Sequence, residues 1–289
     1  MNIPVQRWLF AIAGLLIALS FGFSYGNVGN QETYLPHALN HFNPDFLAND
    51  WLVKETTVYH GSFRWVILLL TSLGSLGWGA ALLNTLLVFL SLYLIHCWHT
   101  TLHRPSAFHG LILTILFVVF DRTRSVGDSY LFSGGLQPSV LASAAWIGAI
   151  LYYFRGRYLV SGCILALGGL FHANFLVLGI GLFTLAHIFL GKERCFNRLV
   201  AQVGPSFIVL LFSLPMLLAA TGGEDVQLAR KIFLEIRAPH HYLPLTYLTD
   251  FWYLGGWTIC GLAAAYAMSD LPHRRLLISL IGALAVSIF

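Results

Sequence analysis

Long uncharged segments are the feature of this sequence that most limits its fold. Residues 78–98 contain no Asp, Glu, Lys or Arg, and about 20 apolar residues in a helix cross the hydrocarbon core of a bilayer. Three other long segments also lack these charged residues: Trp8–Tyr25, Leu136–Phe154 and Leu199–Ala220. Charged residues make up 10% of the chain, against about 25% in soluble domains. The sequence therefore predicts an all-α fold, a polytopic bundle of transmembrane helices in contact with membrane lipids.

Shorter or broken apolar segments raise the expected number of membrane segments to about eight to ten. Residues 158–190 are interrupted near Gly168, Gly169 and His172, so we interpret them as two short helices. The others are Phe63–Gly77, which we expect to lie at the interface or to insert only in part, Ala107–Phe120, Phe251–Met268 and Leu276–Phe289. Residues 1–289 form one predicted transmembrane domain. Its last segment ends without a polar flank, as expected for a piece of a longer chain.

The first apolar segment, residues 8–25, allows two interpretations. A signal peptide and an uncleaved membrane helix both begin with a basic residue such as Arg7. No small-residue cleavage site follows the segment, since the next residues are Gly26 to Thr33 with the sequence GNVGNQET. We therefore favour an uncleaved helix.

The positions of Lys and Arg indicate the orientation, because basic residues gather on the cytoplasmic side. One arrangement places nine bases and two acids on one side, for a net charge of +7, and leaves −3 on the other. The nine bases are Arg7, Arg104, Arg155, Arg157, Lys192, Arg194, Arg198, Arg274 and Arg275. This arrangement predicts a cytoplasmic N-terminus and three outer loops, residues 27–62, 121–135 and 221–250. We expect the membrane to be a bacterial inner (plasma) membrane.

The first outer loop concentrates carboxylates beside the bilayer. Residues 29–55 hold four of the twelve acidic residues, Glu32, Asp45, Asp50 and Glu55, and carboxylates near lipid commonly mark functional sites. Within this loop, Tyr34, Leu35, Ala38, Leu39 and Phe42 repeat at helical spacing. We expect a short interfacial helix with His37, Asn40 and His41 on its opposite face. Glu32 at its start is interpreted either as a helix cap or as a catalytic group.

The other two outer loops hold cationic and imidazole groups. Arg122 and Arg124 are interpreted as partners in local salt bridges or as ligands of a phosphate. Residues 225–237 predict a second interfacial helix that ends at Arg237, followed by His240 and His241. These histidines fit hydrogen bonding to a phosphate or hydroxyl, proton transfer, or a structural turn. His172 fits either a buried imidazole bonded to a freed carbonyl or a functional group.

Metal and cofactor signatures are weak. Adjacent histidines in an extended loop point in opposite directions, and no third ligand stands at zinc-like spacing. The four cysteines form no CxxC pair. The sequence therefore predicts no metal site and no identifiable cofactor, with a divalent ion left open, and the absence of a basic run predicts no nucleic-acid partner.

The layout resembles the GT-C superfamily of polyprenyl-phosphate-sugar-dependent glycosyltransferases, or alternatively one of the uncharacterised bacterial families of polytopic membrane proteins with the same layout. The similarity rests on an outer loop after the first helix that contains Gln31, Glu32, Thr33 and Tyr34, on residues 63–69 with Arg64, on residues 134–157, and on residues 168–174 with the sequence GGLFHAN. In that family the matching acidic residue is commonly an aspartate and acts as catalytic base on the acceptor. The resemblance implies Glu32 as the base, with Asp45 and Asp50 as alternatives.

The resemblance also implies a substrate, a sugar on a polyprenyl-phosphate carrier. Substrate-binding roles would fall to Tyr34, Arg122, Arg124, His172, Arg237 and one of His240 or His241. The competing hypotheses are a transporter or lipid flippase and a non-catalytic membrane subunit. The sequence shows no internal repeat, and its acids lie in loops. Both features favour the enzyme over a transporter.

Overall fold

The described part of the chain is built from α-helices and contains no strand. The computed structural model describes residues 3–23, 31–50, 53, 60–102, 135–189 and 196–219, with isolated positions at 231, 232, 235, 259, 274, 277, 278 and 281. The helices are α1 (Ile3–Gly22), α2 (Gln31–Phe42), α4 (Gly61–Ser72), α5 (Leu76–Leu102), α7 (Pro138–Phe154), α8 (Tyr158–Phe171), α9 (Ala173–Phe189) and α10 (Phe196–Ala219). The predicted all-α fold is confirmed for these residues.

Most helix positions follow the predicted apolar segments. The interruption inside residues 158–190 is confirmed, because α8 ends at Phe171 and α9 begins at Ala173. His172 lies between them in an extended conformation. The expected segments Ala107–Phe120, Phe251–Met268 and Leu276–Phe289 and the helix over residues 225–237 lie outside the described residues or have only isolated described positions.

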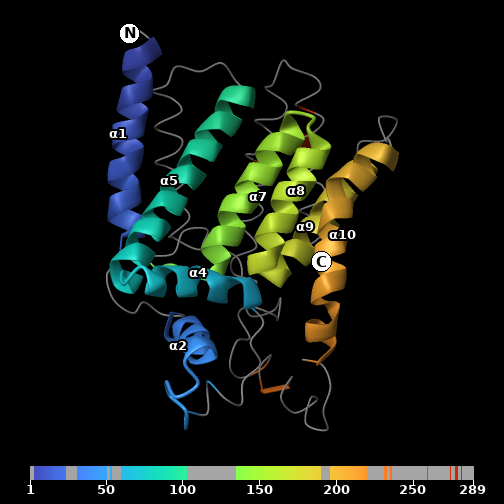
Figure 1. Ribbon diagram of the computed structural model, residues 1–289. Helices are drawn as coiled ribbons and strands as arrows, with labels where there is room; N and C mark the ends of the chain where they lie inside the picture. The colour runs from blue at the N-terminus through green and yellow to red at the C-terminus, as the bar shows by residue number, and fades with distance from the viewer. Residues whose placement is uncertain are drawn as a thin grey trace.

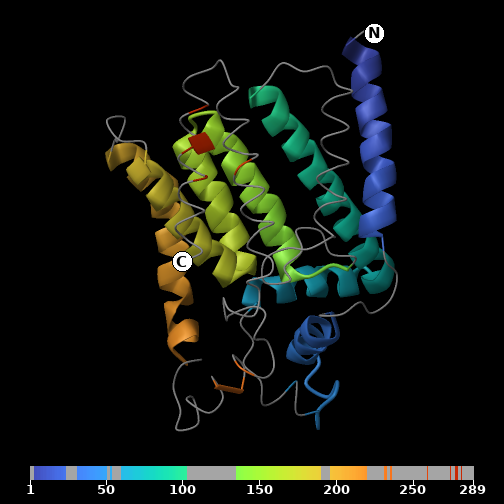
Figure 2. The ribbon, with the colours of Figure 1, turned by 180° about the vertical axis from the view of Figure 1, so that it is seen from behind.

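The helices form a bundle with one crossing element. Helices α1, α5, α7 and α8 run side by side, whereas α4 lies across their ends and α2 packs beyond α4, as both views show (Figures 1 and 2). We call this the α4 end. At the opposite end, a three-residue turn, Arg155 to Arg157, joins α7 to α8. Helix α10 contains Pro205 and Pro215 and bends along its length (Figure 1), as expected where proline interrupts the hydrogen-bond ladder.

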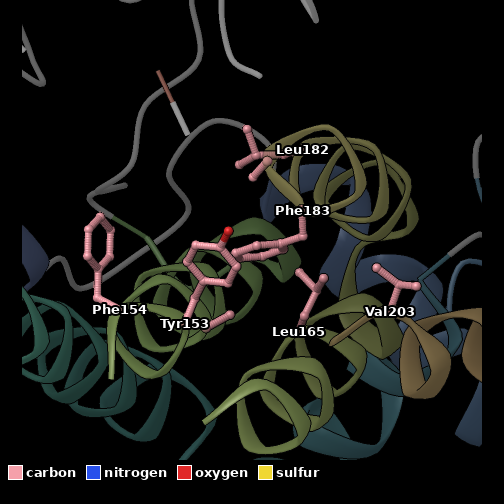
Figure 3. Packing of buried hydrophobic residues seen from close by; sticks show 8 residues of the cluster. Tyr153, Phe154, Leu165, Leu182, Phe183 and Val203 are labelled. Carbon is pink, nitrogen blue, oxygen red and sulfur yellow. The ribbon is translucent and has the colours of Figure 1, made fainter. Parts of the chain in front are cut away.

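An aromatic and aliphatic cluster forms the core near the α7–α8 turn. Tyr153 and Phe183 lie with ring centroids 5.2 Å apart, and Leu182 of α9 and Val203 of α10 join them (Figure 3). The ring of Phe154 lies edge-on to that of Tyr153, with centroids 6.2 Å apart (Figure 3), and packs on Trp98 of α5, with centroids 5.6 Å apart. This cluster fixes α7, α8, α9 and α10 against one another.

Small and polar residues allow close approach between helices. A Cβ on Gly162 of α8 would overlap the carbonyl oxygen of Gln202 of α10. Beside it, the Gln202 side chain donates a hydrogen bond to Ser161 Oγ at 2.9 Å, and Ser161 donates to the carbonyl of Ala149. Small residues and interhelical hydrogen bonds are typical of helix contacts in membranes.

Two described helices are long and apolar enough to cross a membrane, over Leu76–Trp98 and Phe196–Pro215. The other apolar helices are shorter, between 10 and 17 residues. Length and composition alone also suit the core helix of a soluble protein. The expectation of about eight to ten membrane segments is therefore not reached within the described residues, and a multi-pass bundle stays a proposal.

Candidate functional site

Three segments that are distant in sequence meet at the α4 end. They are α2, the residue before α4, and the junction between α8 and α9. His60 precedes α4 and is 5% exposed. Its Nδ1 donates a hydrogen bond to the carbonyl oxygen of Phe171, at 2.8 Å. That carbonyl belongs to the last turn of α8, where carbonyls lack partners within the helix. His60 therefore ties the start of α4 to the end of α8.

Aromatic rings surround His60. The ring centroids of Tyr34 and His60 are 4.9 Å apart in an edge-to-face arrangement, and those of His60 and His172 are also 4.9 Å apart. Phe63 closes the Tyr34 side, with centroids 6.2 Å apart. We call Tyr34, His60 and His172 the histidine cluster. Two predicted substrate-binding residues, Tyr34 and His172, thus share one neighbour, His60, which the sequence analysis missed.

Burial keeps both imidazoles of the cluster neutral. Desolvation lowers the pKa of His60, and its hydrogen bond to Phe171 opposes this shift in part. Desolvation, followed by the influence of His60, lowers the pKa of His172 to about 4. Among the described residues, His172 Nδ1 has no hydrogen-bond partner. A neutral imidazole offers one acceptor and one donor nitrogen, so this cluster can bind hydroxyl groups without adding charge.

A cationic group lies next to the cluster on the polar side of α4. Arg64 Nη1 lies 3.0 Å from Nδ1 of His41 in α2, a hydrogen bond in which the guanidinium donates. The pKa of His37 is lowered by burial and then by Arg64, while Asp50 acts in the opposite direction. We call Arg64, His37, His41 and Asp50 the Arg64 group. Arg64 Nε also donates to the carbonyl oxygen of Gly61 at 3.4 Å, and no carboxylate pairs with Arg64 in the described part of the chain.

The expected polarity of α2 is partly wrong. Leu35 and Leu39 pack toward the core as predicted, and Ala38 is fully buried. His37, however, is also buried, and His41 contacts Arg64. The reason is that α2 packs on α4, which covers His37, whereas His41 stays exposed and accepts the hydrogen bond from Arg64. A helix that packs on one side only has one apolar face and one polar face open to solvent. This pattern was expected for α2 and does not hold at His37.

The predicted carboxylates lie on or after α2. Glu32 belongs to the first turn of α2, and the structure describes its backbone. Asp45 is exposed in the turn that follows α2. Asp50 is also exposed, and its Oδ1 accepts a hydrogen bond from the backbone N–H of Val53 at 3.3 Å. Arg122, Arg124, Arg237, His240 and His241 lie outside the described residues.

The sequence carries only a weak signal for His60. It stands between a tyrosine and a glycine at the last position before an apolar helix, which is common for a capping residue. Its partner is the Phe171 carbonyl, 111 residues further on. Within the described ranges, no group of three or more His, Cys, Asp or Glu residues could hold a metal ion.

Comparisons with known proteins give no assignment. No family model matches the chain, and no match was found among curated proteins or solved structures.

Acidification is expected to weaken the fold through His172. Its pKa of about 4 lies below the usual 6.5, so the unfolded chain binds a proton more readily, and stability falls as pH falls from about 6.5 toward 4. A shift of this size corresponds to at most about 3 kcal/mol. Chemical unfolding in detergent at pH 7, 6 and 5 measures the loss, and His172→Gln should reduce it. His41→Gln is the matched control, because His41 is exposed. An equal pH dependence in His172→Gln and the unaltered chain would contradict this origin.

Proposed function

We propose that this chain is a multi-pass protein of the bacterial inner (plasma) membrane and a GT-C-like glycosyltransferase. The outer surfaces of its helices support the membrane location. Large apolar side chains are exposed on them, among them Phe212 of α10 at 83%, Trp65 of α4 at 63% and Leu86 of α5 at 59%. Surfaces of this kind are unfavourable in water and suit contact with lipid. The segment 78–98 corresponds to about 30 Å of helix, similar to the thickness of the hydrocarbon core.

The length and composition of the crossing helix α4 support a membrane surface at the α4 end of the bundle. With 12 residues, α4 is about 18 Å long, too short to span the hydrocarbon core. The exposed Trp65 of α4 and Trp78 near the start of α5 are residues typical of the membrane interface. We place α4 along the interface.

The distribution of charge supports an outward-facing α4 end. Arg155, Arg157 and Arg198 are exposed near the opposite end, at the α7–α8 turn and the start of α10. Asp45 and Asp50 follow α2 at the α4 end. Because basic residues are retained on the cytoplasmic side, this asymmetry favours a cytoplasmic N-terminus and an outer histidine cluster.

One observation carries the proposed reaction. Helix α2, whose first turn holds Glu32, packs beside Arg64, His60 and His172 at one end of an apolar bundle. This arrangement combines a carboxylate-bearing turn, a cation and neutral hydrogen-bonding groups at the level of lipid headgroups. These groups are the ones that transfer of a sugar from a lipid phosphate requires.

The proposed step is a displacement at the anomeric carbon of the sugar. An acceptor hydroxyl forms a new bond to this carbon as the bond to the carrier phosphate breaks, and polyprenyl phosphate leaves. Glu32 takes the hydroxyl proton, with Asp45 and Asp50 as the alternative bases. Arg64 joins the predicted Arg122, Arg124, Arg237, His240 and His241 in stabilising the phosphate. Tyr34, His60 and His172 orient sugar hydroxyls through neutral hydrogen bonds.

The experiment for this proposal is sugar transfer in membranes that contain the chain. Radiolabelled polyprenyl-phosphate sugars are supplied one at a time, and label is followed from the lipid fraction into product, with membranes lacking the chain as control. Transfer above the control from at least one donor is expected. Folded protein with no transfer from any donor would contradict the proposal and favour a transporter or an accessory subunit.

A further inference from the structure

A basic patch lies at the end of the bundle opposite the proposed catalytic site. Arg155 and Arg157 belong to the α7–α8 turn, and Arg198 lies in the first turn of α10. All three side chains are exposed. We call them the arginine patch. None of them takes part in the proposed sugar transfer.

Aromatic rings hold two of these arginines in place. The Arg155 guanidinium carbon lies 5.7 Å from the ring centroid of Tyr152, and that of Arg198 lies 5.8 Å from the ring centroid of Tyr158. Distances of this kind are typical of cation–π contacts. Tyr158 is in turn supported by Tyr153 and by the buried His187, with ring centroids 5.6 and 5.2 Å away. The patch therefore has an ordered aromatic base.

The backbone of the turn is also fixed. The N–H groups of Arg155, Gly156 and Arg157 donate to carbonyls in the last turn of α7, at 3.1, 2.9 and 2.9 Å. Gly156 has a φ of +68°, a conformation that glycine adopts without strain. The backbone hydrogen bonds that end α7 therefore fix the spacing between the two arginines of the turn.

In the described part of the chain, no ion pair joins these arginines to a carboxylate. Exposed apolar residues lie beside them instead. Leu159 and Val160 follow in the first turn of α8, and Phe196 begins α10 with 76% of its side chain exposed. Helices α8 and α10 pack directly against each other through Gly162 and Gln202, so these apolar residues and the arginines lie on neighbouring helices.

We propose that the arginine patch binds the headgroup of an anionic phospholipid of the cytoplasmic leaflet. The guanidinium groups of the patch would contact the phosphate of the lipid. The acyl chains of the lipid would lie along Leu159, Val160 and Phe196. A nucleic acid would satisfy the charge but would leave the adjoining apolar residues uncovered, which favours a lipid. The proposal rests on the membrane location and is independent of transferase activity.

Lipid selectivity of the full chain in detergent tests this proposal. Native mass spectrometry measures the binding of phosphatidylglycerol and phosphatidylcholine to the chain and to a triple variant, Arg155→Gln with Arg157→Gln and Arg198→Gln. The unaltered chain should prefer phosphatidylglycerol by about 100-fold, because each of the three arginines contributes about fivefold, and the triple variant should lose this preference. The single variant Lys231→Gln, which removes an exposed cation outside the patch and outside the proposed catalytic site, should retain the full preference.

Several results would overturn the assignment. They are equal binding of the two lipids by the unaltered chain, a preference that survives in the folded triple variant, or displacement of phosphatidylglycerol by a short RNA. If the triple variant does not fold, Arg155→Gln and Arg157→Gln are compared singly, and no change in either is then the contradicting result. Sugar transfer is measured on the same samples. Lipid preference without transfer would contradict the transferase proposal alone.

Discussion

Replacing Glu32 by glutamine is expected to lower the rate of sugar transfer by about 10²- to 10⁴-fold, the usual contribution of a general base. Glutamine preserves the size of the side chain but cannot take a proton from the acceptor hydroxyl. Glu32 lies in the first turn of α2, whereas Tyr34 and Ala38 pack in the cluster shared with α4. The initial rate of transfer and the binding of the lipid-linked donor are measured together, and binding should stay nearly constant.

Asp45→Asn is the matched control for this substitution. It also converts a carboxylate to an amide near α2, but Asp45 is exposed in the following turn. We expect it to retain most of the activity. The reverse pattern, with Glu32→Gln active and Asp45→Asn inactive, would identify Asp45 as the base. Normal transfer in both variants, and also in Asp50→Asn, would refute the three carboxylates proposed as the base.

Replacing Gly162 by valine is expected to destabilise the protein by about 3 kcal/mol or more, enough to prevent folding of many proteins. A Cβ at this position would overlap the carbonyl oxygen of Gln202 and lie 2.7 Å from that of Ala201. Both are backbone atoms of α10, so no side chain can move aside. Separation of α8 from α10 would also break the hydrogen bond between Gln202 and Ser161. Unfolding in detergent and yield of folded protein measure the effect.

Gly181→Ala is the control for the Gly162 substitution. Gly181 is also a glycine inside a helix, α9, but nothing lies within 4 Å of the position of an added Cβ. Alanine there should stabilise the chain by about 0.5–1 kcal/mol through its higher helix propensity. Equal stability of Gly162→Val and the unaltered chain would show that α8 and α10 do not pack as described.

The helices could be predicted from the sequence because their cause is local. Uncharged segments such as residues 78–98 must form internal backbone hydrogen bonds wherever they are buried or in lipid. This requirement predicted the helices α5, α7 and α10. The interruption at His172 was also visible, since two glycines and a histidine interrupt an apolar segment. Tyr34 and His172 were predicted as site residues, but their shared contact with His60 was not.

The rest depends on contacts between distant segments. His60 binds the Phe171 carbonyl across 111 residues of sequence, and no local pattern encodes such a pair. The burial of His37 and the hydrogen bond between Arg64 and the exposed His41 both follow from the packing of α2 on α4. Periodicity shows which residues of α2 share a face, but only the packing of α2 on α4 decides which faces are covered.

Sugar transfer, tested from each side of the membrane separately, tests the central proposal most directly. The full chain is reconstituted into sealed vesicles of known orientation with a radiolabelled polyprenyl-phosphate sugar and a bacterial membrane extract that supplies acceptors. Loss of label from the lipid fraction is measured when a membrane-impermeant acylating reagent for histidine is added on one side. We expect transfer that stops when the reagent reaches the exposed His41 beside Arg64 at the α4 end, and that is absent in Glu32→Gln. Transfer blocked only from the side of the α7–α8 turn, or no transfer by folded protein, would contradict the account.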